Sequence, residues 1–132
     1  MLTLEEWMSH AKSDFRLARL AASDEFIRLE QICYHTQQAA EKAIKAVLLF
    51  REIEFPLTHD IEELLEIAEN NGIVLPDPIQ DAGLLTPYAV ETRYPGSWME
   101  IAESDVDEAI RLAEETICWA QKILSENKGE NE

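Results

Sequence analysis

Glycine, proline and cysteine are scarce in this sequence, which has 4 Gly, 5 Pro and 2 Cys among 132 residues. So few glycines and prolines argue against a turn-rich β-sandwich. Two cysteines, Cys33 and Cys118, are too few for a disulfide framework, and no four-ligand zinc cluster is visible. Each lies in an apolar helical pattern, so we expect both to be buried as small hydrophobic residues.

Long apolar stretches and cofactor motifs are also missing. The longest apolar stretch, Ala46 to Phe50, is far too short to cross a membrane. Glu5 and Glu6 stand where a secretory signal would have basic residues. There is no glycine-rich phosphate loop and no HExxH motif. We therefore expect a cytoplasmic protein with no membrane contact, no cofactor and no metal.

Basic residues are few, and the formal net charge is -16. Residues 1–58 carry seven Lys and Arg against nine Asp and Glu, whereas residues 59–132 carry four against eighteen. Such a field repels phosphate backbones, which argues against double-stranded DNA as a partner. Any nucleotide or RNA contact should be local and should use the N-terminal half, while the acidic half should be a solvated surface or a face for a basic partner.

What the sequence does contain is helical periodicity. Hydrophobic residues make up 46% of the chain, and Ala, Leu, Ile and Glu dominate. A first helix is predicted over residues 4–22, because Thr3 and Glu6 have capping-box spacing. Its apolar residues share one face at a 3.6-residue period: Trp7, Ala11, Phe15, Ala18 and Ala22.

A long second helix is predicted from a cap at Ser23 or Asp24 to about Arg51. Thr58 is the predicted cap of a third helix, which should stop at Gly72. The core-facing stripe of the second helix is expected to contain Leu29, Ile32, Cys33, Thr36, Ala40, Ala43, Ile44, Val47 and Leu48.

The fourth predicted helix begins with Asp77 as cap and Pro78 at the first helical position. Gly83 and Pro87 should weaken or kink it before it ends near Arg93.

A last helix is predicted from a cap at Ser104 to about Leu124. The fold class is therefore all-α, an antiparallel bundle of four long helices plus a short or kinked additional helix. Residues 1–125 should form this single helical domain, and residues 126–132 a polar, disordered tail.

The second helix carries polar residues at steps of four: Gln37, Glu41 and Lys45. Glu41 and Lys45 are in the favourable order for an ion pair along a helix. The spacing alone favours a solvated helix face for these residues.

Two further features could carry chemistry. His59 lies at the start of a predicted helix, where the dipole favours a neutral ring. It either contributes chemistry or fixes the helix entry through local hydrogen bonds. Arg93 and Tyr94 would suit a phosphate and a base, or they could cap and pack at a helix end.

Taken together, these segments resemble the HEPN family (higher eukaryotes and prokaryotes nucleotide-binding). The most specific stretch is Gln37 to Ala43, followed by Thr58-His59-Asp60 and Arg93-Tyr94-Pro95. The resemblance implies a bundle of four long helices, often a homodimer. Members like this one are commonly paired with a minimal nucleotidyltransferase, as toxin–antitoxin modules or enzyme subunits.

Other members of that family are metal-independent endoribonucleases that use an Arg followed by four to six residues and a His. Here Arg93 is near the expected position, but no histidine follows it. Arg28 and His35 have the spacing but lie early in the second helix, and we interpret that match as chance. His59 could supply the imidazole from elsewhere in the sequence.

Three hypotheses follow. In the first, the chain is a non-catalytic HEPN module that forms a homodimer, partners a minimal nucleotidyltransferase and binds a nucleotide at His59, Arg93 and Tyr94. Lys42 and Lys45 are weaker binding candidates, because both are expected to face solvent. In the second, the chain is a metal-independent endoribonuclease toxin with His59 and Arg93 as catalytic candidates. In the third, it is a helical interaction protein without a ligand site.

Overall fold

The computed structural model describes residues 2–89 and 100–130, with side chains through residue 125. In order, the elements are α1 (Leu4–Ala21), α2 (Leu29–Phe50), α3 (Ile61–Asn70), α4 (Asp77–Gln80), the 3₁₀ helix η1 (Asp81–Ala89) and α5 (Glu103–Glu130). The described residues contain no strand, which confirms the predicted all-α bundle. No helix among them combines the length and the apolar character needed to cross a membrane.

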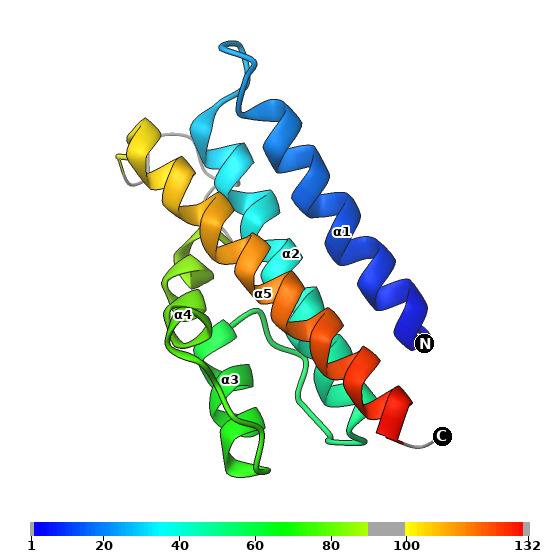
Figure 1. The fold of residues 1–132 in the computed structure, drawn as a ribbon. Helices are drawn as coiled ribbons and strands as arrows, with labels where there is room; N and C mark the ends of the chain where they lie inside the picture. The colour runs from blue at the N-terminus through cyan, green and yellow to red at the C-terminus, as the bar shows by residue number, and fades with distance from the viewer. Residues whose placement is uncertain (1, 90–99, 131–132) are drawn as a thin grey trace.

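The helix α2 is the centre of the molecule. It packs against α1, α3, η1 and α5, and α1 and α5 lie along it as Figure 1 shows. The shorter α3 and η1 pack on each other and on α2. A helix covered on so many sides must be buried nearly all round, and this arrangement places polar residues of α2 inside the protein.

The predicted stripe of α2 is confirmed as core. Except for the half-buried Leu29, all its members are buried. Ala39, Ala40 and Ala43 are completely inaccessible to solvent, and their small side chains allow neighbouring helices to come close. The prediction nevertheless left out part of the buried surface of α2, because Gln37, Glu41 and Lys45 are buried as well.

The start of α2 was predicted too early. The helix begins at Leu29, and the residues that follow Ser23 form a turn instead. The side chain of Asp24 accepts a hydrogen bond from the backbone N–H of Phe26. Such a local bond stabilises a turn at the expense of a helix, which explains the difference.

The fourth predicted helix is mostly not an α-helix. Asp77 is the first residue of α4 rather than its cap, and α4 lasts one turn. The chain then continues as the 3₁₀ helix η1, which contains Gly83 and Pro87. Glycine weakens an α-helix and proline removes one of its hydrogen bonds, so the predicted weakening is confirmed in a stronger form. The predicted end at Arg93 lies outside the described residues.

The third helix is capped by Asp60 rather than by Thr58. The Asp60 side chain accepts from the backbone N–H of Glu63, while the Thr58 hydroxyl accepts from the N–H of Asp60. Thr58 therefore orders the residues before the helix. Gly72 follows the helix with φ +87, a left-handed conformation that glycine adopts easily, as expected for a stop.

The last helix is longer than predicted at its C-terminal end. It begins at Glu103 and continues to Glu130, beyond the predicted end near Leu124. No proline or glycine occurs between Leu124 and Lys128, so the sequence holds no residue that would stop it there.

The two cysteines have opposite environments. Cys33 is buried, as predicted, but Cys118 is exposed, so the expectation for it was wrong. Cys118 follows the buried Ile117 on α5. One residue along an α-helix turns the side chain by about 100°, which carries Cys118 out of the core.

Candidate functional site

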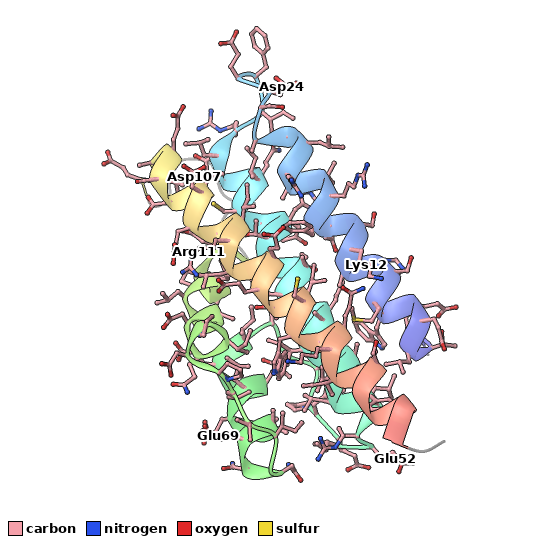
Figure 2. All side chains as sticks on the ribbon, in the orientation of Figure 1. Lys12, Asp24, Glu52, Glu69, Asp107 and Arg111 are labelled. Carbon is pink, nitrogen blue, oxygen red and sulfur yellow. The ribbon has the colours of Figure 1, made fainter. Side chains whose placement is uncertain are left out.

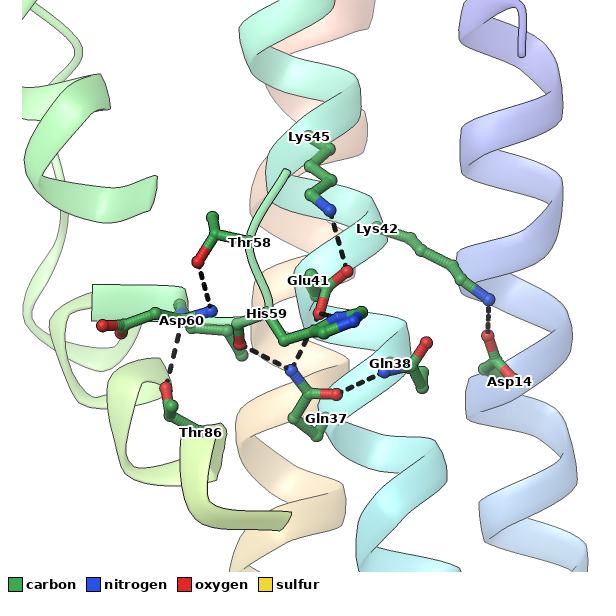
Figure 3. A network of polar contacts seen from close by, with 11 residues as sticks. Asp14, Gln37, Gln38, Glu41, Lys42, Lys45, Thr58, His59, Asp60 and Thr86 are labelled. Carbon is green, nitrogen blue, oxygen red and sulfur yellow. Dashed lines mark hydrogen bonds and ion pairs between the residues drawn. The ribbon is translucent and has the colours of Figure 1, made fainter. Parts of the chain in front are cut away.

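A buried carboxylate on α2 is the centre of the candidate site. The side chain of Glu41 is only 3% exposed, and three polar groups lie within hydrogen-bond distance of its oxygens. Its Oε1 lies 2.9 Å from Nδ1 of His59 and 3.0 Å from Nε2 of Gln37. Its Oε2 lies 2.9 Å from Nζ of Lys45. The four-residue spacing thus gives a buried polar cluster, which Figure 3 shows, instead of a solvated face.

Lys45 does not face solvent as predicted. Its side chain is 7% exposed, and its Nζ lies 5.6 Å from the ring centroid of Trp7 and 5.9 Å from that of Phe55. Trp7 comes from α1 and Phe55 from the segment after α2, so two other parts of the chain cover this side of the helix. The ammonium group is held by Glu41 and by cation–π contacts, and it is engaged within the fold.

Two bonds hold His59, one to the backbone and one to the ring. Its carbonyl oxygen accepts from Nε2 of Gln37 at 3.1 Å, and its Nδ1 contacts Glu41. Thr86 of η1 completes the support, because its hydroxyl accepts from the backbone N–H of Ile61 at 3.1 Å. His59 therefore does fix the helix entry, but through residues of α2 that are distant in sequence.

The ring of His59 is both fixed and accessible. Its side chain is 61% exposed, and no group of the described residues makes a hydrogen bond to its Nε2. An imidazole with one nitrogen held and the other open to solvent can bind a ligand or transfer a proton. The geometry therefore leaves Nε2 as the ring nitrogen without a hydrogen-bond partner among the described residues.

Lys42 belongs to a different cluster. Its Nζ lies 2.6 Å from Oδ2 of Asp14 on α1, and Oδ1 of the same carboxylate lies 3.2 Å from Nδ1 of His35. Figure 3 shows Lys42 reaching toward α1, away from His59. With a side chain 21% exposed, Lys42 is mostly covered, which corrects the expectation that it faces solvent.

Arg93 and Tyr94 lie outside the described residues, so their predicted meeting with His59 stays a prediction. Arg28 bonds to Glu30 and His35 to Asp14, so the two residues with nuclease spacing have different partners. In the ranges 2–89 and 100–130, no group of three or more His, Cys, Asp or Glu side chains could hold a metal ion.

Gln37 and Glu41 were not predicted as site residues. The available signal was their four-residue spacing with Lys45, which indicates a shared helix face but not whether that face is covered. Burial depends on where Trp7 and Phe55 pack, and periodicity along one helix cannot show this.

Comparison with known proteins agrees with this architecture. The HEPN domain family matches residues 4–124. An archaeal HEPN homologue of known crystal structure, ST0689, is 33% identical with a TM-score of 0.73; the alignment covers 93% of this chain and 99% of that one. TT1696 from Thermus thermophilus is 25% identical with a TM-score of 0.77 and the same coverage. No curated protein matches. The match over nearly the whole chain shows that this protein belongs to the HEPN family.

Proposed function

We propose that this chain is a HEPN module that binds a nucleotide at His59 and works together with a minimal nucleotidyltransferase. The observation that carries the nucleotide site is the His59 ring, which is fixed by Glu41 yet 61% exposed. A rigid, accessible imidazole with a buried carboxylate behind it is a costly arrangement for a purely structural residue, since burying a carboxylate requires compensating partners.

The local charge is compatible with a nucleotide despite the net charge of -16. Glu41 and Lys45 form a buried ion pair that is neutral as a unit. Exposed acids such as Glu69 and Asp107 lie near the end of α3 and on α5, as Figure 2 shows, whereas the exposed Asp60, the cap of α3, directly follows His59. Because both lysine candidates are bound to carboxylates, the predicted contacts with a nucleotide are left to His59, Arg93 and Tyr94.

Calorimetric titration with ATP tests the nucleotide site. We expect measurable binding to the unchanged chain, and a loss of about fivefold to tenfold with His59→Ala, as expected when one hydrogen bond to the ligand is removed. His10→Ala is the matched control, since His10 is an exposed histidine on α1. No heat at millimolar ATP, or equal binding by both variants, would contradict this site.

The partnership and the homodimer rest on the family resemblance, and the surface of α1 supports an interface. Leu17 and Leu20, one helical turn apart, are 48% and 65% exposed. Together the two leucines form a small exposed apolar surface that an interface would cover. Co-expression with a minimal nucleotidyltransferase should give a stable complex, and Leu20→Glu should lower the measured mass of a homodimer to that of the single chain. A monomeric unchanged chain would exclude the homodimer.

The alternative, a metal-independent endoribonuclease, is favoured by the same His59–Glu41 contact, because a histidine on a carboxylate suits proton transfer. Incubation with RNA in EDTA tests it, and His59→Ala and Arg93→Ala should each abolish cleavage. If neither cleavage nor nucleotide binding is found, the remaining hypothesis is a helical interaction protein without a ligand site.

A further inference from the structure

We infer that Glu41 is a positioning residue that holds neutral His59 with its proton on Nδ1. The exposed Nε2 then carries a free lone pair and accepts hydrogen bonds. The contact that carries the inference is the 2.9 Å approach of Nδ1 to Oε1 of Glu41. The inferred tautomer of the His59 ring does not depend on the proposed function. The inferred contact of this ring with a ligand does rest on the proposed function.

The partners of Glu41 decide which atom donates. The Nζ of Lys45 lies 2.9 Å from Oε2, and a buried ammonium charge requires a counter-charge, so Glu41 is held as a carboxylate. The amide nitrogen of Gln37 also donates to Oε1. A carboxylate has no proton to give, and therefore Nδ1 of His59 must be the donor in their contact.

Gln37 makes the arrangement rigid. Its Nε2 reaches both Oε1 of Glu41 and the carbonyl oxygen of His59, at 3.0 and 3.1 Å. Its own Oε1 accepts from Nε2 of Gln38 at 2.6 Å, which fixes the orientation of the amide. Residues of α2 thus hold both the ring and the backbone of His59. In many proteins a carboxylate behind a histidine sets the tautomer of the ring in this way.

The tautomer determines which ligand group fits. A free lone pair on Nε2 attracts a donor, such as a hydroxyl group, and not the oxygen of a fully ionised phosphate. In a nucleotide, the ribose hydroxyls are such donors, as are the amino groups of some bases. Because the hydroxyls are common to all ribonucleotides, the inferred contact is with a ribose hydroxyl, and a ribonucleotide should be preferred to its dideoxy analogue.

Nitrogen NMR of the imidazole rings tests the tautomer without any ligand. The spectra are recorded at about pH 8.5, where imidazole side chains are ordinarily neutral. In the unchanged chain we expect His59, identified by its loss in His59→Ala, to show a protonated Nδ1 and an unprotonated Nε2. A protonated Nε2 would overturn the inference.

A variant tests whether Glu41 is the cause. In Glu41→Gln, the new side chain has a single amide oxygen, which should accept from Lys45. Its amide nitrogen then faces Nδ1 of His59 as a donor, so the ring proton of His59 should move to Nε2. If that variant does not fold, Glu41→Leu combined with Lys45→Met removes both buried charges together with the acceptor of Nδ1–H, and the fixed Nδ1–H pattern should be lost. The signals of His10 are the internal control. An unchanged pattern for His59 in the folded variant would overturn the inference.

Titration with ATP and with 2′,3′-dideoxy-ATP tests the ligand contact. We expect the dideoxy compound to bind about fivefold to tenfold more weakly, the effect of one lost hydrogen bond, and that difference should vanish in His59→Ala. Equal binding of both compounds would overturn the ribose contact. If neither compound binds, the proposed function fails, while the NMR result still decides the tautomer.

Discussion

Lys45 holds Glu41 as a carboxylate through a 2.9 Å ion pair in which both side chains are almost completely buried. Two charges removed from water are expensive, so the pair must be close and its remaining atoms satisfied. Here His59 and Gln37 satisfy the carboxylate, and two aromatic rings cover the ammonium group. The Glu41–Lys45 pair therefore contributes to the stability of the bundle and also holds the tautomer of the exposed His59.

Breaking this pair from one side should be strongly destabilising. Glu41→Ala leaves Lys45 buried without its counter-charge, and we expect the free energy of unfolding to fall by about 3–5 kcal/mol. Denaturant unfolding followed by circular dichroism measures the change.

The double variant Glu41→Gln with Lys45→Met is the control for that prediction. It removes both charges at similar side-chain volume. It should lower the free energy of unfolding by much less than the sum of the losses from Glu41→Gln alone and Lys45→Met alone. Additive costs would show that the two side chains do not act as a pair.

Gly72 should tolerate asparagine better than alanine. Its φ of +87 is strained for most residues, yet nothing lies within 4 Å of a Cβ placed there. Gly72→Ala should therefore lower the free energy of unfolding by about 1 kcal/mol through backbone strain alone. Gly72→Asn, which enters this region more easily, should cost less, and equal costs would argue against the explanation.

The two thiols should differ in reactivity. Cys118 is exposed and Cys33 is buried, so a thiol reagent at about pH 8 should modify one thiol per folded chain. The second should react only after denaturation, and Cys118→Ser should remove the fast reaction. Two equally fast reactions would place Cys33 nearer the surface.

Cys33 should also make the fold sensitive to alkali. Burial, assisted by the nearby charge of Asp105, raises the pKa of the Cys33 thiol from 9.0 to about 12. Above about pH 9 the unfolded thiol loses its proton before the folded one, so stability falls as pH rises toward 12. This contribution approaches 1.4 kcal/mol per pH unit within that window. In Cys33→Ala the free energy of unfolding, measured by denaturant unfolding between about pH 9 and 12, should fall less steeply with pH. Parallel curves for the variant and the unchanged chain would contradict this prediction.

Much of the architecture could be predicted because it depends on local patterns. The capping box of Thr3 and Glu6 is present, with both reciprocal hydrogen bonds. The stripe of α2 and the stop at Gly72 were also predicted. Errors arose where local signals compete: Asp24 favours a turn over a cap, and Asp60 caps α3 although Thr58 is also a good cap residue.

The sequence by itself determined the helices, their apolar faces and the resemblance to HEPN proteins, because periodicity and capping act over a few residues. Only the tertiary structure decided that Gln37, Glu41 and Lys45 are buried and that their carboxylate meets His59. That outcome depends on Trp7 and Phe55 covering one side of α2 and on the segment before α3 folding back to it. Contacts such as that of Glu41 with His59, which are 18 positions apart, are set by how the whole chain packs, so no local pattern could reveal them.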